Sequence, residues 1–214
     1  MMFVSFNVNS IRTRLHQLEA VIDALAPDFI GLQETKVQDD DFPVEAIREL
    51  GYHVHFHGQK THYGVALLSK AEPDEIVKGY PWDGEDSQRR LITGQFTVNG
   101  EKLTVINGYF PQGESRDHPV KFPAKEKFYA DLMRYLDELK QAGGHVVVMG
   151  DMNISPTDKD IGIGADNAKR WLRTGKCSFL PEEREWLGQV ESRGHTEVFR
   201  HLHTDEADTG SEFA

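Results

Sequence analysis

Cysteine is almost absent from this chain, since Cys177 is the only one among 214 residues. A lone cysteine cannot form an internal disulfide, so the composition favours a reducing compartment, and we expect a cytoplasmic location. The sequence also lacks an apolar run long enough to cross a membrane. Residues 1–10 lack the charged start and long apolar core of a signal peptide. We therefore expect a soluble protein without a membrane partner. We also expect it to be a monomer.

Positive charge is scarce, with 24 Lys and Arg against 35 Asp and Glu and a net charge of −11. This balance argues against a general nucleic-acid coat protein, because phosphate binding needs clustered cations. A nucleic-acid enzyme is still compatible with it, since residues 116–127 and 159–176 are locally basic. An ordinary solvated face is the alternative interpretation of each basic segment.

Linkers, repeats and the common nucleotide-binding loops are also missing. We expect one domain over residues 1–208, because 38% hydrophobic residues are ample for a core. Residues 209–214 resemble a tail or an engineered scar. No glycine-rich loop ends in Lys-Ser or Lys-Thr, which excludes the common kinase and GTPase loop. Residues 161–167 lack the third glycine of a dinucleotide loop and follow no strand, so we reject that interpretation.

The main feature of this sequence is a series of short apolar strands that end in polar residues. Phe3–Val8 alternates as a strand, a helical pattern runs on to Pro27, and residues 29–32 form a second apolar strand. A strand, a helix and a strand in succession form a βαβ unit, so the two strands should be parallel with their carboxyl ends at one rim. Asn7 and Glu34 should therefore lie side by side.

The middle of the chain predicts a mixed sheet. An antiparallel hairpin is expected around Asn99-Gly100, and the other elements follow from periodicity and end signals. The full set is a short helix at 43–50, strands at 52–57, 63–69, 90–98 and 102–109, a long helix at 122–139 and a helix at 181–193.

Three histidines, His53, His55 and His57, share one face of the predicted strand at 52–57. Three imidazoles can chelate a transition metal. No cysteine accompanies them, so a half-exposed strand face is the simpler interpretation.

The stretch from Val146 to Asp158 organises the chain. Its apolar, β-branched run stops at Gly150 and is followed by Asp151 and Asn153. This is the pattern of a strand end, where open α/β sheets place their binding and catalytic residues. The alternative is a turn in which these two side chains only satisfy backbone groups.

The predicted strand ends together carry two carboxylates, two amides and a phenol, from Asn7, Glu34, Tyr109, Asp151 and Asn153. These are hard oxygen ligands and hydrogen-bond donors, so Mg²⁺ is the expected ion, with Mn²⁺ as a substitute. Such an ion stabilises the charge that develops when water attacks a phosphate. The sequence therefore predicts metal-assisted phosphodiester hydrolysis.

Several motifs resemble those of the exonuclease III type of apurinic/apyrimidinic endonucleases, in the endonuclease/exonuclease/phosphatase superfamily. They are residues 6–9 (FNVN), 31–36 (GLQETK), 62–66 (HYGVA), 107–111 (NGYFP), 150–153 (GDMN) and 171–173 (WLR). The resemblance implies an α/β fold, a four-layer α/β/β/α sandwich of two mixed sheets flanked by helices. It also implies a Mg²⁺-dependent DNA-repair nuclease that degrades duplex DNA from 3′ ends or nicks, cleaves at abasic sites and removes 3′ blocking groups.

The same resemblance implies the role of each residue at the rim. Glu34 is the principal metal ligand, and Asn7 helps to hold the metal shell. Tyr109 contacts the reacting phosphate. Asp151 orients or deprotonates the attacking water and Asn153 positions the phosphate, both also near enough to belong to the metal site.

The segments that approach DNA in this family point to four further residues here. Gln112 follows the strand of Tyr109, Lys176 lies in a segment that is helical in the family, and Arg90 and Arg170 complete the set. For Gln112, Arg90 and Arg170, a surface or structural role is the alternative.

One departure from the family concerns the end of the chain. The family continues with a tryptophan-containing loop, an Ile-Asp strand motif and a Ser-Asp-His-x-Pro motif, which this sequence lacks. We therefore expect a fold without its last strands and impaired catalysis. The alternative is a non-catalytic fragment that binds duplex DNA. A lipid-headgroup phosphatase is disfavoured, because the sequence offers no apolar membrane loop or amphipathic basic helix.

Overall fold

The computed structural model describes residues 1–203, which divide into two compact units. The first unit comprises residues 1–110 and 139–152, and the second comprises residues 111–138 and those from 153 onward. Every strand of the described chain belongs to the first unit.

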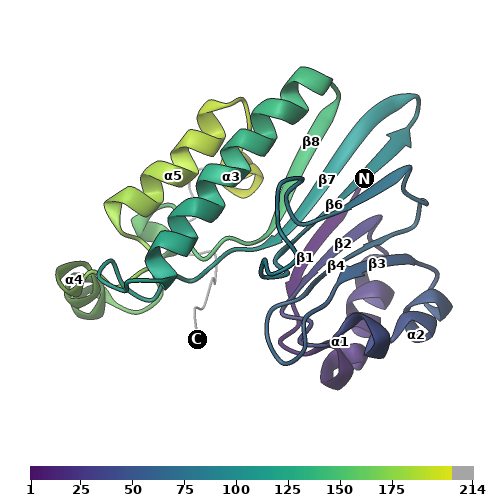
Figure 1. Ribbon diagram of the computed structural model, residues 1–214, viewed down its shortest axis with the longest axis horizontal. Coiled ribbons are helices and arrows are strands. Elements are labelled where there is room, and N and C mark those ends of the chain that lie inside the picture. The colour runs from purple at the N-terminus through teal and green to yellow at the C-terminus, as the bar shows by residue number, and fades with distance from the viewer. Residues whose placement is uncertain (204–214) are drawn as a thin grey trace. The chain divides into compact units, whose positions relative to one another are not determined.

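Two four-stranded mixed sheets form the first unit (Figure 1). Their strand orders are β1-β2-β4-β3 and β5-β6-β7-β8. The strands are β1 (Phe3–Asn7), β2 (Phe29–Gln33), β3 (His53–His57), β4 (Val65–Ser69), β5 (Glu75–Lys78), β6 (Leu91–Val98), β7 (Glu101–Tyr109) and β8 (His145–Asp151). β1 is parallel to β2 and β7 is parallel to β8, whereas the other neighbours are antiparallel. The predicted βαβ unit and the Asn99-Gly100 hairpin are thus confirmed.

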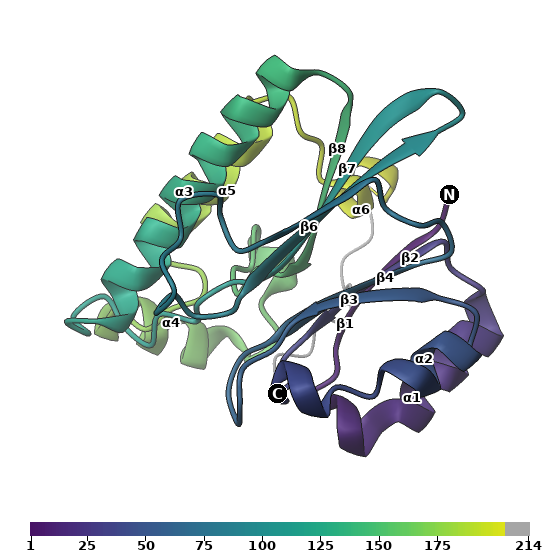
Figure 2. The same ribbon diagram turned by 45° about the vertical axis from the view of Figure 1, so that its right-hand side comes forward.

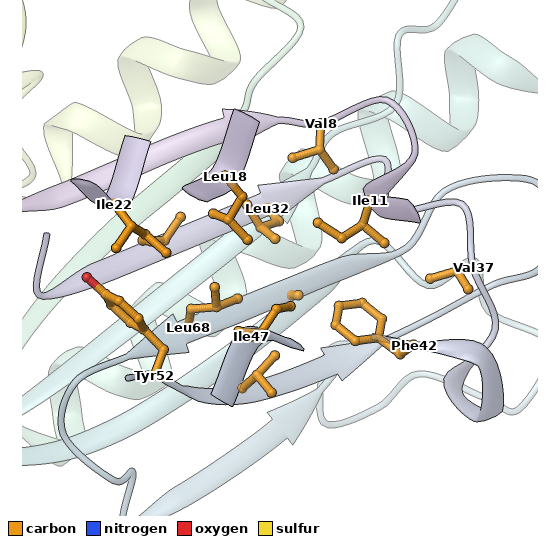
Figure 3. Packing of buried hydrophobic residues seen from close by; sticks show 13 residues of the cluster. Val8, Ile11, Leu18, Ile22, Leu32, Val37, Phe42, Ile47, Tyr52 and Leu68 are labelled. Carbon is orange, nitrogen blue, oxygen red and sulfur yellow. The ribbon is translucent and has the colours of Figure 1, made fainter. Parts of the chain in front are cut away.

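The first sheet is covered on one face by α1 (Ile11–Leu25) and α2 (Val44–Glu49), as Figures 1 and 2 show. Between these helices and the sheet lies a continuous apolar core, which Figure 3 shows at close range. Leu18 and Ile47 supply the helices' inner faces, and Leu32 and Leu68 supply the sheet. Burial of each side chain of this size stabilises the fold by about 1.5–3 kcal/mol, and this keeps the helices on this face of the sheet.

The opposite face of the first sheet packs against the second sheet. Successive residues of a strand point to opposite faces, so Phe29 and Leu67 enter the core between the sheets, where they join Phe96 and Val105. The rings of Phe29 and Phe96 meet edge to face at 4.9 Å. β2 and β4 are therefore buried on both faces, as their continuous apolar sequences indicate.

Asn107 of β7 joins the two sheets by hydrogen bonds. Its Nδ2 donates to the backbone oxygens of Leu32 (2.9 Å) and Ala66 (2.8 Å), and its Oδ1 accepts from Gln33 Nε2 (2.6 Å). Asn107 is fully buried. A Cβ on Gly31 would lie 2.6 Å from Asn107 Oδ1, so the glycine makes room for this bridge.

The second unit is helical. It contains α3 as far as residue 138 (the helix is Lys121–Ala142), α4 (Ala165–Thr174), α5 (Pro181–Ser192) and α6 (Val198–Leu202). α3 and α5 lie side by side in Figures 1 and 2. Their contact includes the rings of Tyr129 and Trp186, 5.8 Å apart. Single 3₁₀ turns occur at Asp39–Asp41 in the first unit and Asp158–Asp160 in the second.

The α/β class, with two mixed sheets flanked by helices, is confirmed. Periodicity did not predict β5, whose four residues offer too short a pattern, nor did it predict α4 and α6. Lys176 lies just after α4, where it pairs with Ser115 in an isolated bridge, and not inside a helix. No helix within residues 1–203 combines the length and apolar character needed to cross a bilayer. One domain over 1–208 stays a prediction, and its last residues and the 209–214 tail lie outside the described chain.

Asn107→Ala should destabilise the protein by about 2–4 kcal/mol, because it leaves buried groups of Gln33, Leu32 and Ala66 without their partner. The measurement is the free energy of unfolding in urea. Asn167→Ala is the matched control, since Asn167 is exposed and makes one hydrogen bond, to Ile163 O. Its effect should stay within about 0.5 kcal/mol. Equal losses in the two variants would contradict the bridging role.

Candidate active site

The ends of four strands meet at one rim of the first unit. Asn7 is the last residue of β1 and pairs with Gln33, the last residue of β2, so that Glu34 follows directly. Tyr109 and Asp151 are partners at the ends of the parallel strands β7 and β8. The structure thus brings together Asn7, Glu34, Tyr109 and Asp151, as predicted.

One nitrogen atom connects the two carboxylates of this rim. Asn7 Nδ2 donates to Glu34 Oε1 at 2.9 Å and to Asp151 Oδ2 at 3.0 Å. The Asn7 Oδ1 accepts from the backbone N–H of Asn9 at 3.1 Å, which fixes the amide with its NH₂ toward the acids. Asn7 therefore holds the acidic side chains of the two sheets close together, and its part in the metal shell stays a prediction.

Glu34 is held in its ionised form. Burial alone would raise its pKa, but hydrogen bonds from Asn7, Lys36 and Tyr109 outweigh that effect and lower the pKa below its usual value. The Lys36 ammonium lies 2.8 Å from Glu34 Oε2. Lys36 was not among the predicted site residues, although its place two residues after Glu34 in the GLQETK motif was a usable signal. At neutral pH this site therefore presents a carboxylate.

Tyr109 stays a neutral phenol. Burial raises its pKa, and so do the charge of Glu34 and the hydrogen bond that the hydroxyl makes with Glu34. The positive charge of Arg90 lowers the pKa of Tyr109, but by less than these effects raise it. A neutral hydroxyl can donate a hydrogen bond to a phosphate oxygen, whereas a phenolate would repel it.

Arg90 lies beneath the rim and is only 8% exposed. Its guanidinium lies over the ring of Tyr63, 4.0 Å from the centroid, and over that of Tyr109 at 4.8 Å. Its Nη1 donates to Tyr109 O at 3.1 Å and its Nε to Gln88 Oε1 at 2.6 Å. Arg90 therefore orients Tyr109 directly, and contact with DNA stays a prediction.

The backbone of the rim is strained. Left-handed φ values occur at several non-glycine residues of its loops, among them Asn9 (41°), Ser10 (90°), Glu34 (53°), Lys36 (54°) and Tyr63 (54°). Each such residue costs of the order of 1 kcal/mol or more, and outliers of this kind cluster at functional sites. Backbone hydrogen bonds between the loops, such as Ser10 N to Glu34 O (2.8 Å) and Lys36 N to Tyr63 O (3.0 Å), hold the conformation.

Asn153 and Gln112 belong to the second unit, where they line a cavity of about 280 Å³. The other lining residues are Ser155, Ile161, Gly162, Ile163, Trp171, Ser178 and Phe179. Asn153 has a φ of 51°, so this loop too adopts a left-handed conformation.

Trp171 and Phe179, which line this cavity, stack with their ring centroids 5.7 Å apart. Lys176 Nζ lies over the Trp171 ring at 4.7 Å. Arg170 is exposed on α4. A cation and an aromatic pair at a cavity are suited to a nucleic-acid ligand.

The donor set of the rim fits a hard divalent cation. Mg²⁺ is commonly held by one or two carboxylates and keeps several waters, and Glu34 with Asp151 offers that number. Among residues 1–203, no group of three or more His, Cys, Asp or Glu is arranged to hold a metal. His53, His55 and His57 share one face of β3, with His53 exposed and the other two partly buried.

Comparison with known proteins agrees with this geometry. The profile of the endonuclease/exonuclease/phosphatase family matches residues 4–207. The chain is 58% identical over 213 residues to exodeoxyribonuclease III of Haemophilus influenzae, a match that covers 100% of this chain and 80% of the relative. The chain belongs to the endonuclease/exonuclease/phosphatase family.

Solved structures of the family superpose closely on this chain. The 3′ phosphatase NExo from Neisseria, bound to product DNA hairpin, has a TM-score of 0.82 at 34% identity, covering 96% of this chain and 76% of its own. An AP endonuclease from Archaeoglobus fulgidus has a TM-score of 0.82 at 33% identity, covering 95% and 75%. The resemblance drawn from the motifs is thus confirmed.

Arg90→Lys should destabilise this member of the endonuclease/exonuclease/phosphatase family by about 1–2 kcal/mol. An ammonium cannot stack on the two rings or keep both of the guanidinium's hydrogen bonds. Urea unfolding measures the loss. Arg89→Lys is the neighbouring control, because the Arg89 side chain is 39% exposed. A smaller loss at Arg90 than at Arg89 would show that the stacked guanidinium contributes little.

Proposed function

We propose that this chain is a DNA-repair phosphodiesterase of the exodeoxyribonuclease III type, acting at 3′ ends, nicks and abasic sites of duplex DNA. The observation that carries the proposal is the single Asn7 nitrogen that lies within 3.0 Å of both the Glu34 and the Asp151 carboxylate. Two acidic side chains held at one point create a site that attracts a divalent cation and, through it, a phosphate. The relatives support this choice of substrate, since they include an exodeoxyribonuclease, a DNA-bound 3′ phosphatase and an AP endonuclease.

Glu34 and Asp151, together with Asn7 and Asn153 as the other members of the proposed ligand set, would hold Mg²⁺, or Mn²⁺ in its place. When bound, the ion would neutralise phosphate charge and stabilise the charge of the attack by water. The Lys36 ammonium, 2.8 Å from Glu34 Oε2, offsets part of the negative charge of that carboxylate.

The remaining roles fall to this chain's own side chains. When a phosphate binds, the Tyr109 hydroxyl exchanges its hydrogen bond with Glu34 for one that it donates to a phosphate oxygen, while Arg90 keeps the ring in place. Asp151 accepts the proton of the attacking water, and Asn153 hydrogen-bonds the phosphate without changing charge. Such a positioned base typically contributes about 10²–10⁴-fold to rate.

We further propose which residues contact the DNA duplex. Arg90, Gln112, Arg170 and Lys176 are the proposed contacts, with Lys176 and Trp171 forming a cation and ring pair at the cavity of the second unit. We also propose a cytoplasmic monomer. The buried, unpaired Cys177 is compatible with a reducing compartment.

The alternative is a chain that binds duplex DNA but does not cleave it. Parallel gel-shift and cleavage assays on abasic-site and nicked duplexes with Mg²⁺ separate the two functions. Cleavage that stops on addition of EDTA supports the phosphodiesterase. Binding without cleavage supports the alternative.

Glu34→Gln should abolish Mg²⁺-dependent cleavage of abasic duplex DNA, because an amide keeps the shape of the side chain but loses the charge that holds the cation. The fold should survive, as a thermal melt would show. Glu45→Gln is the matched control, since the Glu45 side chain is 80% exposed on α2. Parental cleavage by the Glu34 variant would refute its assignment as the principal ligand.

Asp151→Asn should lower single-turnover cleavage by about 10²–10⁴-fold while DNA affinity changes little, because the amide cannot accept the proton of water. Rates with enzyme in excess isolate the chemical step. Asp166→Asn, at an exposed position of α4, serves as the control. The assignment fails if the Asp151 variant loses binding yet cleaves bound DNA at the parental rate.

A further inference from the structure

A charged pair lies in the interior of the second unit, and the mechanism above does not use it. Lys125 of α3 and Glu183 of α5 both have side chains that are 0% exposed, with Nζ and Oε1 2.5 Å apart. Removing two charges from water costs several kcal/mol per ion, and a well-packed apolar pair of similar volume is often as stable or more stable. The stability of the helix pair alone therefore does not explain this choice of residues.

The other hydrogen bonds of Lys125 show where its ammonium is directed. Nζ also donates to the backbone oxygen of Asn153 at 2.7 Å and to that of Gln112 at 3.3 Å. With Glu183, these two carbonyls use all three N–H donors of the ammonium. Both loops in question line the cavity of the second unit, and Asn153 has the left-handed φ of 51° noted above.

Glu183 is itself fixed. Its Oε2 accepts from the backbone N–H of Leu180 at 2.8 Å, at the start of α5. The Cys177 thiol hydrogen-bonds the same carboxylate, and burial together with that negative charge raises the pKa of the thiol to about 12. The thiol thus stays protonated, and the carboxylate provides an immobile anchor for Lys125.

We propose that Lys125 is a positioning residue, whose ammonium, anchored by Glu183, sets the place of the Asn153 and Gln112 loops. The inference rests on the proposed function, in which Asn153 hydrogen-bonds the phosphate and Gln112 contacts DNA. A Lys at this point fixes the backbone carbonyls of two residues that line the cavity, which an apolar residue cannot do. Misplacing a contact by about 1 Å can cost on the order of 10²-fold in rate.

The test separates stability from positioning by comparing Lys125→Met with the double variant Lys125→Met/Glu183→Met. The single variant leaves a buried carboxylate unpaired and should melt well below the parent. The double variant removes both charges and should recover most of that loss. If Lys125 positions the loops, the double variant should still have a kcat on abasic duplex DNA about 10- to 100-fold below the parent, with KM changed much less.

Hydrogen exchange gives a readout that does not depend on cleavage. The Ser155 N–H, two residues after Asn153, donates to Ser178 O at 2.9 Å. In the double variant this amide should exchange at least about tenfold faster than in the parent, although the melting temperature is recovered. Lys127→Met is the control, because Lys127 is exposed on the same helix.

Each outcome decides one of the two proposals. Parental kcat or parental exchange at Ser155 in the restabilised double variant overturns the positioning role of Lys125. Failure of the parent to cleave DNA overturns the proposed function, and the exchange measurement then still decides whether Lys125 orders the loop.

Discussion

Two carboxylates from different sheets share one amide nitrogen, and the candidate site depends on that contact. Glu34 and Asp151 would repel each other as anions, so holding them together needs a donor between them and a cation nearby. Asn7 supplies the donor and Lys36 part of the charge. Because Asn7 ends β1, the arrangement requires that the two sheets keep a fixed register relative to each other.

Strain in the loops is offset by the rigidity of the strands that carry them. Glu34, Lys36 and Tyr63 adopt left-handed conformations that their side chains disfavour, and bonds between neighbouring loops hold them there. Arg90 orients Tyr109 in a similar way, since its guanidinium lies over the rings of both Tyr63 and Tyr109. The polar groups of the rim are thus oriented before any ligand arrives, which lowers the cost of binding.

Periodicity predicted the βαβ unit, the hairpin and the long helices, because those elements bury regular apolar patterns. It also placed Asn7 beside Glu34, since parallel strands end at one rim. The resemblance to a family then assigned roles to Tyr109 and Asp151. The hydrogen bonds of Asn107 between the sheets and the three hydrogen bonds donated by Lys125 could not be predicted from the sequence, because each depends on contacts between segments dozens of residues apart.

The Asn107 bridge also limits how the site can move. Its hydrogen bonds to Leu32 and Ala66 join the sheets only a few residues from Glu34, so sliding of one sheet over the other would break them before the acids separate. The distance between Glu34 and Asp151 should therefore keep its native value until the two sheets come apart. Heating such a protein should leave its rim geometry constant up to the onset of cooperative melting, without a gradual loosening of the carboxylate pair.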